Sequence, residues 1–148
     1  MSCSCYIIIA VVVALLVIYL YKKGVINLPE FFDEVPPIIE ELKLELAKVH
    51  PKCAHMKIVK GSKSYTINKE KIYLCLHDKK TGHMYDKNML TYVLLHEMAH
   101  VLNTGNADPK EDIGHTDAFY VVFDKLLKKA EQVGVYDPSL PLVDEYCK

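Results

Sequence analysis

Residues 89–102, MLTYVLLHEMAHVL, predict a helix that the rest of the chain must enclose. The segment is apolar on nearly every face, whereas a helix at a protein surface carries a single apolar stripe. Asp86 or Asn88 supplies the N-cap, and the helix is expected to continue to about Asn103. It therefore belongs in the middle of a domain, where its polar side chains are largely shielded from water.

Two histidines share one face of this helix. His96 and His100 are four residues apart, so their imidazoles point the same way and can bind one metal ion. Glu97 projects about 100° further round the helix, which keeps its carboxylate out of the ligand set but close to a metal-activated water. Zinc suits imidazole ligands, so the pattern predicts a zinc site with Glu97 as general base.

A catalytic zinc also needs a third protein ligand and one open position. The extended motif with glycine and a third histidine shortly after the first two is excluded, because Asn103 and Asn106 stand at those positions. His115 is the better candidate, since its spacing to Phe119 predicts that it faces the central helix from the last helix. The alternative ligands, for which helix capping is the ordinary role, are Glu111, Asp112 and Asp117.

Two helices and three strands are predicted around the central helix. The helices cover residues 33–49 and about 113–133, where apolar residues recur at helical spacing. Alternating apolar residues predict a hairpin from residues 57–60 and 65–67, followed by a stronger strand over residues 71–77. This order of elements predicts an α+β domain with a small, mainly antiparallel sheet.

The amino-terminal run has the character of a membrane anchor. Residues 6–21, YIIIAVVVALLVIYLY, contain no charge, and with residues 3–5 the helix would reach roughly 28 Å, close to the thickness of a bilayer core. A cleaved signal peptide would show a basic start and a small-residue cleavage site, which are absent here. The run therefore predicts a transmembrane helix that contacts lipid through residues 5–21.

This anchor predicts the domain organisation. Residues 1–23 form the anchor and residues 24–148 the zinc-binding domain, with residues 24–32 as a juxtamembrane linker. Because Lys22 and Lys23 lie only on the carboxyl-terminal side of the run, the positive-inside rule places that domain in the cytosol, or inside a virion membrane. The amino terminus would lie on the other side.

Cysteine content and charge narrow the choice of function. The five cysteines are odd in number and contain no C-x-x-C pair, a poor disulfide framework that agrees with a reducing compartment. Residues 52–80 hold eight lysines against two acids, and residues 97–148 hold ten acids against five lysines. All 18 basic residues are lysine, which argues against direct binding of nucleic acid because arginine provides the bidentate contacts.

A buried helix with HEMAH, a short loop, and GH-x-x-x-F before the next helix resembles the WLM and SprT-like zinc metallopeptidases. The resemblance covers roughly residues 71–130 and extends to small anchored WLM-type proteins of large DNA viruses. It implies a minimal zincin fold, Zn²⁺ as cofactor, and a protein or peptide substrate. The chain lacks the nucleic-acid module of relatives that cleave proteins crosslinked to DNA. The motif residues here are His96, Glu97, His100, His115 and Phe119.

These observations predict a membrane-anchored zinc metallopeptidase that hydrolyses peptide bonds with a zinc-activated water and Glu97 as general base. The strand over residues 71–77 is the candidate edge for an extended substrate. Candidate donors to the developing oxyanion, each with a structural role as the simpler explanation, are Tyr85, Tyr120 and His83.

Two other functions are compatible with the sequence. In the first, the protein is a non-catalytic, membrane-associated scaffold in which zinc only joins the last two helices. In the second, it is a membrane-tethered binder of polyanions through the lysines of residues 52–80, although the absence of arginine speaks against this. Glu97 favours the peptidase, because a structural zinc site does not require a buried glutamate beside the ligands.

Overall fold

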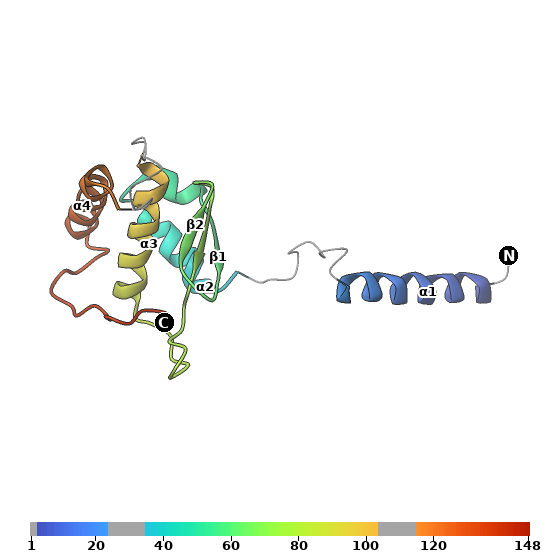
Figure 1. Ribbon diagram of the computed structural model, residues 1–148. Helices are drawn as coiled ribbons and strands as arrows, with labels where there is room; N and C mark the ends of the chain where they lie inside the picture. Colours follow the sequence, from blue (N-terminus) through green and yellow to red (C-terminus); the bar gives the residue numbers. More distant parts are fainter. Residues whose placement is uncertain (1–2, 24–34, 104–114) are drawn as a thin grey trace. The chain divides into compact units, whose positions relative to one another are not determined.

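The computed structural model describes residues 3–23, 35–103 and 115–148. The chain divides into two compact units, Met1–Glu34 and Val35–Lys148. The described part of the first unit is one helix, α1, Cys3–Lys22 (Figure 1). The linker predicted over residues 24–32 lies outside the described residues.

The prediction of an N-terminal transmembrane helix is wrong. Among the described residues, no helix combines the length and the apolar character that a membrane span requires. The predicted orientation across a bilayer depended on this helix and stays untested.

The second unit has the predicted α+β composition, with α3 at its centre. Figure 1 shows α3 between α4 on one side and a three-stranded sheet on the other. The elements in chain order are α2 (Pro37–Leu46), a 3-10 helix η1 (Pro51–His55), β1 (Lys57–Lys60), β2 (Tyr65–Ile67), β3 (Lys71–Leu74), α3 (Lys87–Leu102) and α4 (Asp117–Gln132).

The sheet is mixed, and the predicted hairpin does not form. The strand order is β1-β3-β2, with β3 parallel to β1 and antiparallel to β2. β3 occupies the centre because its Ile72 and Leu74 are fully buried, whereas Thr66 on β2 is only half-buried. The strand that follows the first two in sequence therefore lies between them, and β2 becomes an edge strand.

Gly61 ends β1 at a close approach to the central strand. Its backbone N–H donates to the carbonyl of Leu74, and a Cβ atom here would lie 2.9 Å from the Lys63 carbonyl oxygen and 3.0 Å from the Tyr73 Cβ. We expect Gly61→Ala to lower the free energy of unfolding by about 1–3 kcal/mol, because the backbone must shift to relieve the overlap. Chemical denaturation tests this, with exposed Ser62→Ala as control; equal stability of both variants would contradict it.

The central helix forms as the sequence predicts. Asp86 is the N-cap, and its Oδ1 accepts a hydrogen bond from the Met89 backbone N–H at 2.9 Å. The helix ends at Leu102 with Asn103 as C-cap. Most side chains of α3 are buried, whichever face of the helix they lie on, and Leu94, Leu95 and Met98 have 0% exposure. The prediction that this helix lies at the centre of the domain is therefore confirmed.

The last helix begins later than predicted. α4 starts at Asp117 because Thr116 is its N-cap and accepts a hydrogen bond from the Phe119 backbone N–H. His115 therefore precedes the helix and does not lie on its inner face. The buried face of α4 consists of Phe119, Phe123, Leu126 and Ala130. Gly134, at φ +74°, follows the helix end as predicted.

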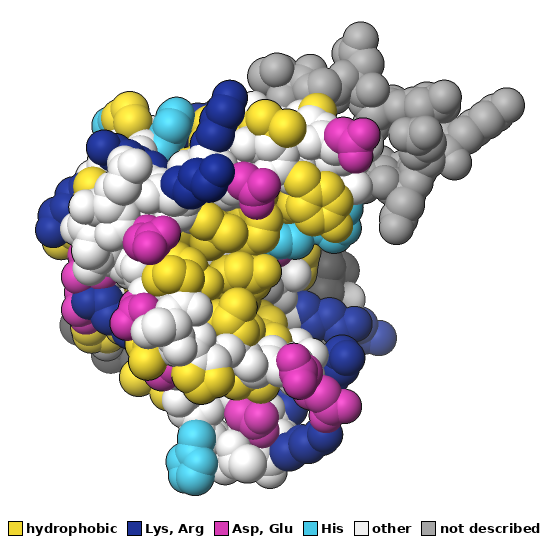
Figure 2. Space-filling view, turned by 90° about the vertical axis from the view of Figure 1, so that its left-hand side faces the viewer, with side chains coloured by type: hydrophobic (Ala, Val, Ile, Leu, Met, Phe, Trp, Pro, Cys, Tyr) yellow, Lys and Arg dark blue, Asp and Glu magenta, His cyan; other side chains and the backbone are white. Residues whose placement is uncertain are grey.

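Residues 137–148, here named the C-terminal segment, run back along the second unit. Asn88 and Asp137 exchange two hydrogen bonds of 3.0 and 2.8 Å at its start. A disulfide joins Cys75 to Cys147 near its end, although the odd number of cysteines and the missing C-x-x-C pair indicate a poor disulfide framework. The 72-residue separation of this pair leaves no local pattern in the sequence. Figure 2 shows hydrophobic side chains gathered on one face of the molecule, next to histidines.

Candidate metal centre

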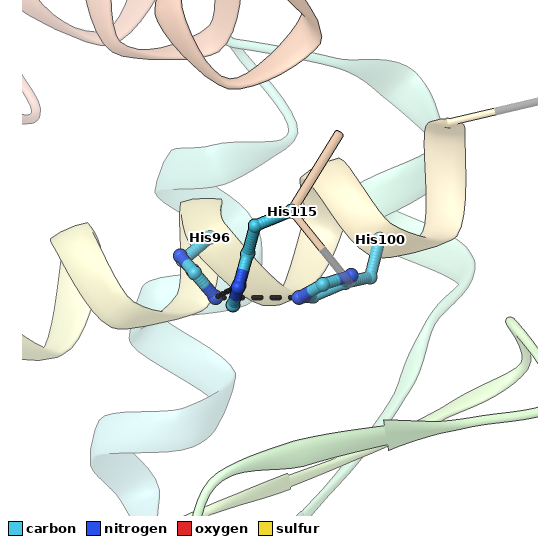
Figure 3. A group of neighbouring side chains, drawn as sticks. All are labelled: His96, His100 and His115. Carbon is cyan, nitrogen blue, oxygen red and sulfur yellow. Dashed lines mark hydrogen bonds between the residues drawn. The ribbon is translucent and has the colours of Figure 1, made fainter. Parts of the chain in front are cut away.

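Three histidine side chains converge on one point. His96 and His100 extend from adjacent turns of α3, and His115 reaches them from the residue before the α4 N-cap (Figure 3). The Nε2 atom of His96 lies 3.3 Å from that of His100 and 2.9 Å from that of His115. All three candidate ligand atoms lie within 4.8 Å of one another. The structure thus brings together the three histidines that the sequence singled out, and their role as ligands stays a prediction.

Two nitrogen separations in the cluster are close to those of a zinc site. Tetrahedral zinc with Zn–N distances of about 2.0–2.1 Å places its ligand nitrogens roughly 3.3–3.4 Å apart. The 3.3 Å separation of His96 and His100 matches this value, and the 2.9 Å separation of His96 and His115 is a few tenths of an ångström shorter. Three imidazoles would fill three of the four positions of such an ion and would leave the fourth for a water molecule or a substrate.

Burial prepares two of the three histidines, His96 and His100, for a metal. Burial, together with the smaller effects of the neighbouring His100 and His115, lowers the pKa of His96 to about 4. The pKa of His100 is lowered by burial and by His115. His96 and His100 are therefore neutral at pH 7, which is the form that binds metal.

The lowered pKa of His96 predicts how the zinc-free chain responds to acid. Between about pH 4 and pH 6.5 the unfolded chain binds a proton at this residue that the folded chain does not, so stability falls as the pH drops through that window. We expect His96→Gln to reduce this loss of stability. Urea denaturation of both zinc-free chains at pH 7 and pH 5 measures it, and an identical pH dependence would contradict the prediction.

Phe119 supports all three rings from α4. Its side chain is fully buried, and its ring centroid lies 5.0 Å from that of His96, 4.5 Å from that of His100 and 4.8 Å from that of His115. Aromatic contacts at these distances restrict how the imidazoles can turn. The motif phenylalanine therefore has a structural reason for its place four residues after His115.

Glu97 lies beside the histidines but outside the ligand cluster. Its side chain is only 6% exposed, and its Oε2 accepts a hydrogen bond of 2.7 Å from the hydroxyl of Thr66 on β2. Burial raises the pKa of Glu97, and the Thr66 hydrogen bond partly opposes this effect. A carboxylate with a raised pKa is suited to accept and return a proton near neutral pH.

The other predicted site residues that the structure describes lie outside the histidine cluster. Tyr120 is half-exposed and its ring lies 6.2 Å from that of His115, whereas the Tyr85 hydroxyl is occupied by a hydrogen bond from the Cys147 backbone N–H. His83 is exposed in the turn before α3, and Asp117 is exposed in the first turn of α4. Both lie outside the ligand cluster. Glu111 and Asp112 fall outside the described residues.

The predicted substrate edge is also wrong. β3 is the central strand and is paired on both sides, so residues 71–74 offer no edge to a peptide. β2 is the edge strand that contacts α3, through Thr66 and Glu97. Sequence reasoning missed Thr66, because its partner is 31 residues away and no local motif connects them.

The comparisons with known proteins give viral relatives. The chain is 45% identical over 96 residues to an uncharacterized protein of Invertebrate iridescent virus 6, covering 64% of this chain and 50% of the relative. It is 46% identical over 93 residues to an uncharacterized protein of Invertebrate iridescent virus 3, covering 63% and 54%. It is 34% identical over 125 residues to an uncharacterized protein of Acanthamoeba polyphaga mimivirus, covering 78% and 56%.

The chain spans about half the length of the curated relatives it matches. No protein-family model matches the chain. No solved structure matches it either. The resemblance to the WLM and SprT-like metallopeptidases stays a prediction, carried by the motif residues around His96.

Proposed function

We propose that the chain is a zinc-dependent peptidase. The observation that carries this proposal is the convergence of three histidine nitrogens beside a buried glutamate that an edge strand holds in place. A structural zinc site closes all four positions with protein ligands, and it has no need of a carboxylate next to them. A three-nitrogen site with an adjacent base suits hydrolysis.

Each residue has one role in this proposal. His96, His100 and His115 hold the ion. Zinc, when bound, supplies Lewis acidity that polarises a peptide carbonyl and makes water acidic near neutral pH. Because Thr66 engages Oε2 of Glu97, Oε1 is the oxygen that accepts a proton from the attacking water. The same carboxylic acid then returns that proton to the nitrogen of the leaving amine.

The edge strand β2 is the place where we expect the substrate to bind. One side of β2 pairs with β3, and an extended peptide can pair with the other side through main-chain hydrogen bonds. Thr66 lies on this strand and bonds Glu97, so a peptide aligned on β2 would run past the general base. The scissile carbonyl would then meet the open position of the metal centre.

Removal of the metal tests the proposed function. We expect the purified full chain, loaded with zinc, to cleave an unstructured protein such as casein. A chelator should abolish cleavage, and added zinc should restore it. Cleavage that continues at the same rate in the presence of the chelator would contradict the zinc mechanism. A zinc-loaded chain that cuts no peptide and unfolds on chelation would instead support the scaffold alternative.

The hydrogen bond from Thr66 predicts an effect on the rate of cleavage. Thr66→Val keeps the shape of the side chain but removes the donor, so the Glu97 carboxylate loses its fixed orientation. We expect kcat to fall roughly 10- to 100-fold, as for other groups that orient a residue at a metal site, with KM and zinc content unchanged. Thr66→Ser retains a hydroxyl and should restore most of the rate. Wild-type kcat in Thr66→Val would contradict this role.

A further inference from the structure

A pocket of about 520 Å³ adjoins the metal centre, and the C-terminal segment forms one of its walls. Met89, Tyr92 and Val93 of α3 line it within two turns of His96, which also contributes to its surface together with Glu97. The C-terminal segment contributes another wall with Val143, Tyr146 and Lys148, and Lys63 and Ser64 also line the pocket. A chain bound at the metal centre would therefore have a largely apolar surface, with two lysines, beside its reacting bond.

The C-terminal segment that forms this wall contains no helix or strand, and its strongest contacts with the rest of the unit lie near its end. The Tyr146 hydroxyl donates to the Cys75 carbonyl and also contacts the Ser64 hydroxyl at 3.0 Å. The Cys147 backbone N–H donates to the Tyr85 hydroxyl at 2.9 Å. These contacts surround the Cys75–Cys147 disulfide, which links the wall covalently to the residue after β3.

The part of the wall before this anchor has fewer contacts. The Val143 backbone N–H makes a weak hydrogen bond of 3.4 Å with the Met89 sulfur, and Lys80 forms an exposed ion pair of 2.6 Å with Glu145. Leu142 packs partly buried against the core, whereas Leu140 and Val143 keep 48% and 39% of their surface exposed. The disulfide is therefore the one covalent tie among several weaker contacts that hold the described wall.

We propose that the Cys75–Cys147 disulfide controls peptide binding: in the oxidised chain the wall is in place, and the pocket accepts a large apolar side chain of an extended peptide. The proposal rests on the proposed function, because it assumes a peptide that lies along β2. Its aliphatic and aromatic surface favours a side chain such as phenylalanine, leucine or methionine, and its two lysines, Lys63 and Lys148, disfavour a basic one.

The redox step needs a thiol reductant. Two thiol groups of a dithiol supply two hydrogen atoms, the S–S bond breaks, and Cys75 and Cys147 each gain an S–H bond while the reductant forms its own disulfide. Cys75 and Cys147 are only 3% and 7% exposed, so a thiol gains access when the end of the segment lifts. After reduction only hydrogen bonds and the Lys80–Glu145 ion pair hold the end of the segment, so it lifts more often and the pocket spends more time without this wall.

The test measures binding without cleavage. The full chain carrying Glu97→Gln is loaded with zinc and titrated into a fluorescein-labelled octapeptide with a central phenylalanine, or with lysine at that position. We expect the phenylalanine peptide to bind at least about tenfold more tightly, by fluorescence anisotropy. Dithiothreitol, or the added change Cys147→Ser, should weaken its binding by at least about tenfold. Cys53→Ser, at a buried cysteine outside this disulfide, is the matched control and should bind like its parent.

Each result decides one part of the proposal. Equal affinity for the two peptides would overturn the apolar pocket, and equal affinity before and after reduction would overturn the switch. Hydrogen exchange checks the fold: reduction should expose amides of residues 139–148 and leave α3 protected, whereas loss of protection in α3 would also overturn a local switch. A wild-type chain that cleaves nothing but shows redox-dependent binding would contradict the proposed function alone.

Discussion

Glu97→Gln is expected to abolish cleavage while zinc stays bound. Glutamine has the size of glutamate and can keep a hydrogen bond with Thr66, but its amide cannot accept a proton from water at neutral pH. General acid–base catalysis contributes roughly 10²- to 10⁴-fold to a rate, so we expect kcat to fall by about 10³-fold or more. Cleavage of casein and zinc content, measured on the same preparation, test both halves of this statement.

The matched control for this variant is Glu131→Gln. Glu131 is an exposed glutamate on α4, outside the histidine cluster, and the substitution makes the same change in charge. It should cleave like the wild-type chain. A Glu97→Gln chain with wild-type kcat would remove Glu97 from the mechanism. A variant that loses its zinc would mean that Glu97 acts as a ligand.

His115→Ala is expected to weaken zinc binding by about 100-fold. Structural zinc sites with four ligands contribute roughly 10–16 kcal/mol, so one ligand accounts for about 3 kcal/mol. His115 is also the ligand that joins the start of α4 to α3, and its Nε2 lies 2.9 Å from that of His96. Competition with a chromophoric zinc chelator measures the dissociation constant of each variant.

The control here is His83→Ala, which removes an exposed histidine from the turn before α3. Its zinc affinity should equal that of the wild-type chain. If His115→Ala bound zinc as tightly as the control, His115 would not be a zinc ligand. The convergence of the three rings would then be unrelated to metal binding.

The centre of the molecule could be predicted from the sequence because its signals are local. The apolar run around His96 specifies a buried helix, the side chain of Asp86 caps it, and the spacing of His96 and His100 places both rings on one face. His115 is also predicted near them, but as a residue on the inner face of the last helix. In the structure His115 precedes the α4 N-cap, and Phe119 at the start of the helix packs against its ring.

The features that the sequence did not reveal depend on distant contacts. β3 enters the sheet between β1 and β2, an order that neighbouring residues cannot specify. Thr66 meets Glu97 across 31 residues, and Cys75 meets Cys147 across 72. The membrane span predicted from the uncharged amino-terminal run is wrong, because no helix among the described residues has the length and apolar character of a span.

X-ray absorption at the zinc edge of the purified full chain tests the central claim most directly. The account predicts about one zinc per chain, with three imidazole nitrogens at about 2.0 Å and one further oxygen or nitrogen at a similar distance. Sulfur ligands at about 2.3 Å, a fourth imidazole that closes the site, or a folded chain that takes up no zinc would contradict it.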